Sequence, residues 1–180
     1  KELGMNAVAI TDHGNMFGIK DIYNYVNGGA LKGYKKKLEK AKKEGNEAKA
    51  AQIERWIDRL KTGDFRLIIG CEMYVANESL YEQTDRRDIG RHLVVLAKNK
   101  TGYKNLIKLV SKAWTDGFYS HPRTDKKELA AHKEGLIIAS ACLGGEIPQL
   151  IMRGMDDEAD KQVKWWKDTF GDDYYIELQR

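Results

Sequence analysis

The strongest constraint on the fold is a short apolar run, Ala7 to Ile10, which is followed at once by the polar tetrapeptide TDHG at 11–14. Small and β-branched residues without a polar break are typical of a strand that is buried on both faces of a parallel sheet. In β/α barrels, such strands place reactive side chains at their C-terminal ends. We therefore expect His13 at a sheet edge, as a metal ligand, a general base or a hydrogen-bonded rim residue.

Further apolar runs predict four more strands, at 65–76, 92–97, 135–140 and 174–178. Segments with helical periodicity separate most of these strands, and they predict helices at 16–26, 101–114, 126–133, 147–153 and 156–170. Asn27 to Gly29 is expected to break the first helix, and Gly117 to Asp125 is expected to form a loop. Near-continuous apolar strands that alternate with helices predict an α/β architecture with a parallel sheet.

The segment 30–62 differs in kind, because it combines two helical stripes of apolar residues with many lysines. Residues 32–61 contain eleven Lys or Arg and five Asp or Glu, whereas the whole chain of 180 residues has a net charge of only +4. A turn signal at Gly45 and Asn46 lies between the stripes, so we expect a charged helical hairpin. This hairpin is either a solvated insertion or a basic arm that contacts nucleic acid or a partner protein.

The composition, with 42% hydrophobic and 32% charged residues, is typical of a soluble globular protein. The chain has no apolar run of about 18 residues and no signal-peptide pattern, so no membrane span is predicted. Cys71 and Cys142 lie far apart and in no CxxC pair, which favours a reducing compartment, and we expect a cytoplasmic protein. Cys71 is expected to be buried in its strand, and His121 and His132 are expected at the surface.

Four potential metal ligands lie at the ends of the predicted strands: His13, Glu72, His92 and Cys142. Imidazole, carboxylate and thiolate groups are the ligands of zinc, and mixed sets also suit manganese or iron. A carboxylate can in addition bridge two ions, as two-metal phosphoesterase sites require. No two of the four residues are close in sequence, so they form one site only if separate βα units bring them to the same rim.

Six motifs follow one another in an order that resembles a known family: TDHGNMFG (11–18), IIGCEMYV (68–75), HLVVLAKNKTGYKNLIKLVS (92–111), GFYSHPRTD (117–125), EGLIIASACLGGEI (134–147) and FGDDYYIELQR (170–180). Together they resemble the PHP (polymerase and histidinol phosphatase) domains of the replicative, C-family bacterial DNA polymerases, the polymerase III alpha subunits. The resemblance covers nearly the whole chain except the hairpin at 30–62. It implies that residues 1–180 are part of a single PHP domain, with the hairpin inserted within it.

The resemblance implies a distorted β/α, TIM-like barrel with a metal cluster at its C-terminal rim. It assigns His13, Glu72, His92 and Cys142 as metal ligands and Asp12 as a supporting residue rather than a ligand. The implied cofactors are divalent metal ions, zinc or manganese, with up to three in an intact domain. It assigns no catalytic residue beyond these ligands.

The family also carries an HxH motif with a following aspartate on its first strand, and a DxH motif on a late strand. Neither motif is present in this chain. We expect the first upstream of Lys1 and the second downstream of Arg180, so that this segment is a fragment whose barrel is incomplete at both ends. Such a segment on its own is expected to bind metal weakly and to lack useful hydrolytic activity.

The same resemblance implies that the intact protein is a DNA-directed DNA polymerase of chromosomal replication. Its PHP site would be a metal-dependent phosphoesterase, a 3′–5′ exonuclease that removes mismatched nucleotides. The implied partners are DNA and other polymerase III subunits, such as the sliding clamp and the proofreading subunit. No membrane partner is implied. His121 and Arg123 are minor candidates for a DNA or partner contact. The alternative is a non-catalytic scaffold that stabilises the polymerase or binds a separate exonuclease, and a stand-alone PHP phosphatase is opposed by the CLGGE and YIELQR motifs.

Overall fold

The computed structural model describes residues 5–61, 65–83 and 88–179 of the chain. These residues form two compact units, the first from residues 1–10 and 17–68 and the second from residues 11–16 and 69–180. Thr62, the last residue of the predicted hairpin segment, and residues 84–87 lie outside the described residues. Each unit is described by itself.

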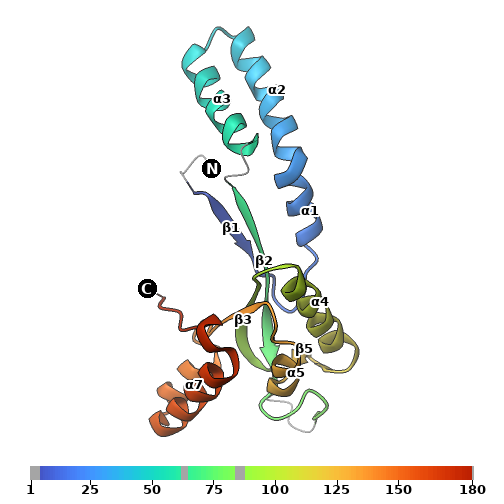
Figure 1. The fold of residues 1–180 in the computed structure, drawn as a ribbon, viewed down its shortest axis with the longest axis vertical. Helices are drawn as coiled ribbons and strands as arrows, with labels where there is room; N and C mark the ends of the chain where they lie inside the picture. The colour runs from blue at the N-terminus through green and yellow to red at the C-terminus, as the bar shows by residue number, and fades with distance from the viewer. Residues whose placement is uncertain (1–4, 62–64, 84–87, 180) are drawn as a thin grey trace. The chain divides into compact units, whose positions relative to one another are not determined.

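The first unit contains a strand and a long run of helix (Figure 1). Strand β1 (Ala7–Ile10) pairs with β2 (Arg66–Val75). Helix α1 (Ile19–Asn24) continues through a π-helical segment (Tyr25–Gly29) into α2 (Ala30–Lys43). The predicted break at Asn27–Gly29 is therefore wrong. Glycine costs about 1 kcal/mol in a helix interior but does not clash there, and Gly29 keeps helical angles, with φ −61° and ψ −43°.

Helices α2 and α3 (Glu47–Lys61) lie side by side as an antiparallel pair (Figure 1). They share a small apolar core, in which Ala41 and Ile53 are each 1% exposed. Leu31, Tyr34, Leu38 and Trp56 pack around this core. The charged side chains are therefore left on the outer surfaces of the two helices.

The second unit is built on a mixed sheet rather than on the predicted parallel one. β2 pairs antiparallel with β3 (Arg91–Ala97), which pairs antiparallel with β6 (Leu136–Ala139). β5 (His121–Thr124) pairs parallel with β2, and β7 (Tyr174–Tyr175) pairs parallel with β6. Antiparallel neighbours need only a loop between them, and the described residues between β2 and β3 contain no helix.

Two further predictions about strands need correction. The predicted loop at 117–125 contains β4 (Phe118–Tyr119), which pairs antiparallel with β5. The predicted strand at 174–178 forms ladder pairs only at Tyr174 and Tyr175. The strand order β4-β5-β2-β3-β6-β7 has two ends, and no pairing within the described ranges joins them, so the sheet is open rather than a closed barrel.

Helices complete the core of the second unit: α4 (Lys100–Thr115), α5 (Lys126–Ala131), α6 (Glu146–Met152) and α7 (Asp156–Phe170). Side chains from these helices and from β2, β3 and β6 form one buried cluster, which includes Val95, Leu106, Leu129, Ile138 and Trp166. Asn99 caps α4 by accepting a hydrogen bond from the Gly102 N–H at 3.0 Å. Among the described helices, none combines the length and apolar character needed to cross a membrane.

Candidate metal centre

The TDHG segment lies along the middle of β2, where it brings His13 beside Glu72. The Gly14 N–H donates to the Glu72 carbonyl at 2.8 Å, and the Glu72 N–H donates to the Asp12 carbonyl at 3.0 Å. His13 and Glu72 thereby form a parallel bridge. Backbone pairing therefore explains why a histidine and a carboxylate that are distant in sequence lie side by side.

The CLGG turn is held against the start of β3 in a similar way. The His92 N–H donates to the Gly144 carbonyl at 3.0 Å. A Cβ at Gly144 would lie 2.9 Å from His92 Nδ1, so only glycine allows this close approach. Cys142, two residues earlier, is thereby placed against the His92 ring.

Glu72, His92 and Cys142 form one compact group of donors. His92 Nδ1 lies 3.0 Å from Glu72 Oε1 and 3.3 Å from Cys142 Sγ. One donor atom from each of the three residues lies within 4.8 Å of the other two. The side chains of Glu72 and His92 are 17% and 24% exposed, so the group is sheltered but reachable from solvent.

The donor set fits a divalent metal ion. Zinc binds nitrogen, oxygen and thiolate sulfur at about 2.0–2.3 Å, which separates neighbouring ligands of a tetrahedral site by roughly 3.3–3.7 Å. The observed contacts of 3.0 and 3.3 Å are close to these separations. Nδ1 is the atom of His92 that faces the other two donors, so it is the atom that would bind an ion.

His13 lies on the other side of the same carboxylate. Its Nε2 is 3.4 Å from Glu72 Oε2, and its side chain is 59% exposed. The two oxygens of Glu72 therefore face different histidines, Oε1 toward His92 and Oε2 toward His13. A carboxylate in this position has the arrangement needed to bridge two ions.

Tyr74 is a neighbour of the group that the sequence analysis did not identify. Its hydroxyl lies 3.4 Å from His13 Nδ1, and its ring meets the edge of the His92 ring at 5.3 Å. Burial and, next, the negative charge of Glu72 raise the pKa of Tyr74 above its usual value. The period of two along β2 places Tyr74 on the same face as Glu72, and this spacing is the signal that could have revealed it.

Asp12 and Cys71 support the strand rather than the donor group. The Asp12 carbonyl accepts hydrogen bonds from the Glu72 N–H and from Cys71 Sγ, the latter at 3.3 Å. Cys71 is fully buried in β2, as predicted. Burial raises the pKa of its thiol to about 12, so the thiol stays protonated at neutral pH and is not available as a thiolate ligand.

The expectation for Arg123 fails because β5 packs into the unit, whereas His121 on the same strand is half-buried. Arg123 is 0% exposed and donates to the Asp88 carboxylate at 2.9 Å and the Glu82 carbonyl at 2.7 Å, so it cannot contact DNA. The His121 ring lies against the Tyr74 ring at a tilt of 48°, with ring centroids 4.6 Å apart. Its Nδ1 is buried and has no hydrogen-bond partner among the described residues. His132 is half-buried and contacts Glu128.

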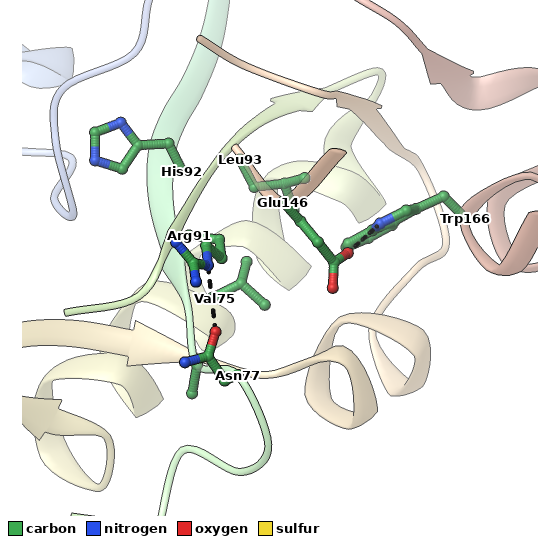
Figure 2. Close-up of a pocket in the computed structure, with 8 residues that line it drawn as sticks. Val75, Asn77, Arg91, His92, Leu93, Glu146 and Trp166 are labelled. Carbon is green, nitrogen blue, oxygen red and sulfur yellow. Dashed lines mark hydrogen bonds between the residues drawn. The ribbon is translucent and has the colours of Figure 1, made fainter. Parts of the chain in front are cut away.

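A small cavity of about 10 Å³ lies beside this region, lined by residues that include Arg91, His92, Glu146 and Trp166. Figure 2 shows the His92 imidazole pointing away from Glu146 and Trp166, which hydrogen-bond to each other at 2.9 Å. The cavity has room for about one water molecule. A nucleotide therefore does not fit there.

Comparisons with known proteins identify the family of the chain. The PHP domain family matches residues 1–180. The DNA polymerase III subunits alpha of Borreliella burgdorferi and Treponema pallidum are 41% and 39% identical to the chain over 100% and 99% of its length. That of Thermus aquaticus is 36% identical over 96% of the chain. The chain spans only 12–13% of the length of these three relatives. Since the family match extends from the first residue to the last, the chain belongs to the PHP domain family.

Proposed function

We propose that the chain is the PHP segment of a bacterial DNA polymerase III alpha subunit, and that its donor group serves a metal-dependent 3′–5′ exonuclease. The intact protein would copy chromosomal DNA in the bacterial cytoplasm. Its partners would be DNA and the other subunits of the replicase, including the sliding clamp and a proofreading subunit. The similarity to three polymerase subunits of the same name along nearly the whole chain supports this identity.

The observation that carries the proposal is the meeting of Glu72, His92 and Cys142 around a common point. The three donors differ in chemical type, come from β2, β3 and the turn after β6, and are not among the buried residues of the core cluster. His92 Nδ1 contacts both of the other donors, and His13 Nε2 contacts the second oxygen of Glu72. Such a set suits zinc or manganese better than magnesium or calcium, which prefer oxygen ligands alone.

In the proposed site, Glu72, His92 and Cys142 would hold one divalent ion, and Glu72 and His13 would contribute to a second. Divalent ions held in this way supply Lewis acidity toward a phosphodiester and activate water as a nucleophile. The residues of this chain orient the donors: Gly144 allows the approach of the turn to His92, and the Asp12 carbonyl fixes Glu72 on β2. The open sheet would be one arc of the PHP-type barrel, and the upstream HxH and downstream DxH motifs would complete a site for up to three ions.

An exonuclease assay on the intact polymerase tests this proposal. The substrate is a duplex with a labelled, mismatched 3′ end, assayed in zinc or manganese without nucleotide triphosphates. We expect His92→Ala to lower the rate of release of the terminal nucleotide at least 100-fold. His132→Ala is the matched control, because His132 follows the end of α5 and contacts Glu128 rather than the donor group, and its rate should equal that of the wild type.

Equal exonuclease rates in the wild type and His92→Ala would contradict the catalytic proposal. If polymerisation then fell in step with thermal stability, the domain would instead be a scaffold. If binding of a separate proofreading exonuclease were lost, the domain would be a docking site. The assay therefore separates the two functions that the family resemblance implies.

A further inference from the structure

The hairpin formed by α2 and α3 has a marked difference in charge between its two helices. Helix α2 carries seven lysines and one acidic residue, whereas α3 carries four basic and three acidic residues. The apolar core between the helices is self-contained, with Ala41, Ala50, Ile53 and Ile57 all buried. This core fixes which face of α2 is covered by α3 and which face remains outside.

Four lysines lie along the outer face of α2. Lys32, Lys36, Lys40 and Lys43 follow the i, i+4, i+8, i+11 pattern, so they form one stripe. With a rise of 1.5 Å per residue, this stripe is about 16 Å long. The inward residues Ala30, Tyr34 and Ala41 lie on the opposite side of the helix. We call these four residues the lysine stripe.

The lysine stripe is nearly free of internal ion pairs within the described residues. Lys40 makes only a long contact of 3.8 Å with Glu44, and its side chain is 78% exposed. Lys32, Lys36 and Lys43 are exposed and take part in none of the described ion pairs. Lys42, by contrast, reaches across to Glu54 on α3 at 2.8 Å and so ties the two helices together. The stripe therefore presents charge to a partner rather than to the hairpin.

The chemistry of this face favours a phosphate backbone as the partner. Each DNA strand carries one negative charge per about 3.4 Å of axis, so a stripe of this length faces several phosphates. The aromatic residues of the hairpin, Tyr34 and Trp56, pack against each other with ring centroids 5.6 Å apart and are not presented for base stacking. A membrane helix needs an open apolar face, and that of α2 is covered by α3.

We propose that the lysine stripe binds the sugar–phosphate backbone of DNA without reading its sequence. The choice of DNA rests on the proposed function, in which the intact protein acts on DNA. Lysine–phosphate contacts carry no base information and release counterions on binding. The hairpin would then add a salt-dependent, sequence-independent increment to the affinity of the polymerase for duplex DNA.

The test compares two variants of the intact polymerase that lose the same number of charges. The first is the quadruple variant Lys32→Gln, Lys36→Gln, Lys40→Gln, Lys43→Gln. The matched control carries the same change at four exposed lysines of the second unit that take part in none of the described ion pairs: Lys104, Lys108, Lys127 and Lys164. Glutamine is a good helix former, so both variants should retain the wild-type helical circular dichroism.

The readout is the affinity for a labelled DNA duplex, measured by fluorescence anisotropy over a range of salt concentrations. Each lost phosphate contact should reduce the slope of log K against log salt by about 0.9. We expect the stripe variant, which loses four such contacts, to lose about 3.6 from this slope with any duplex sequence, and the control to keep the wild-type slope. Equal slopes in the two variants would overturn the proposal. This holds also if the stripe variant has lost the binding of an acidic protein partner, because its DNA affinity would then be unaffected.

The result of the DNA-binding test is independent of the result of the exonuclease test. The lysine stripe belongs to the first unit, and the donor group belongs to the second. The metal content and the His92→Ala assay therefore test the site without the stripe. A reduced salt slope together with no metal-dependent hydrolysis would support the DNA contact and reject the phosphoesterase. An unchanged salt slope together with metal-dependent hydrolysis would reject the DNA contact and support the phosphoesterase.

Discussion

At the scale of single residues, Tyr74 is the side chain that best explains how His13 is oriented. Its hydroxyl lies 3.4 Å from His13 Nδ1, while His13 Nε2 faces Glu72. When a histidine binds metal through one nitrogen, the other nitrogen usually donates its proton to a fixed acceptor. Tyr74 is placed to be that acceptor, and it is therefore a positioning residue for His13.

We expect Tyr74→Phe to weaken metal binding at the His13 side of the site by about 10-fold, because loss of such a supporting contact typically costs 10- to 100-fold in affinity. The measurement is a competition titration of zinc or manganese on the intact protein. Tyr175→Phe is the control, since Tyr175 is 55% exposed and its change should leave the affinity unaltered. Identical affinities for Tyr74→Phe and the wild type would show that Tyr74 serves packing alone.

The sequence predicted the candidate ligands of the site, but it did not predict Tyr74, the side chain that contacts His13. His13, Glu72, His92 and Cys142 stand out because polar residues at the ends of apolar runs are uncommon, and the structure brings their side chains together. Their role as ligands stays a prediction. Tyr74 was missed because an aromatic residue in a strand is more often a core residue, and only the side-by-side placement of β2 and the TDHG segment gives it a partner.

At the scale of secondary structure, β5 shows how tertiary contacts override local signals. The GFYSHPRTD segment has the glycine and proline of a loop, yet residues 121–124 form a strand beside β2. Proline is tolerated in short or edge strands, and β5 is bordered by the two-residue strand β4. Arg123 fastens this strand through the Asp88 carboxylate and the Glu82 and Gly117 carbonyls.

We expect Arg123→Met to lower the free energy of unfolding by about 3 kcal/mol, because the half-buried Asp88 carboxylate loses its cationic partner and, among the described residues, keeps only the Asn77 and Gly90 N–H donors. The Asp88 side chain is 13% exposed, and it pairs with Arg123 at 2.9 Å. The measurement is urea denaturation of the intact protein, in which the unfolding transition of the PHP domain is monitored. Arg153→Met, at an exposed position after α6, is the control and should change stability by less than about 0.5 kcal/mol. A similar small change for Arg123→Met would mean that the ion pair is dispensable.

Helix and strand positions were largely predictable, whereas pairing directions were not. The helical stripes at 101–114 and 156–170 correspond to α4 and α7 to within one residue at each end. Apolar runs do not encode whether a neighbour is parallel, so β3 was placed in a parallel sheet although it pairs antiparallel on both sides. The Asn27–Gly29 error has another origin, because the intrinsic cost of glycine is small enough for the flanking helices to outweigh it.

At the scale of the whole molecule, the candidate chemistry and the candidate DNA contact reside in different units. All four donor residues belong to the second unit, and the lysine stripe belongs to the first. The sequence could indicate this division through the uneven distribution of charge. It could not indicate whether the sheet closes, because closure depends on strand pairings between distant segments rather than on any local pattern.

The central claim is that Glu72, His92 and Cys142 bind one metal ion together. Cobalt(II) substitution in the intact protein tests it directly, because a thiolate ligand gives cobalt an intense sulfur-to-metal charge-transfer absorption. The comparison is between Cys142→Ser and Cys71→Ala, the latter removing a buried thiol that points away from the donor group to the Asp12 carbonyl. We expect the absorption to persist in Cys71→Ala and to disappear in Cys142→Ser, and an undiminished absorption in Cys142→Ser would show that Cys142 is not a ligand.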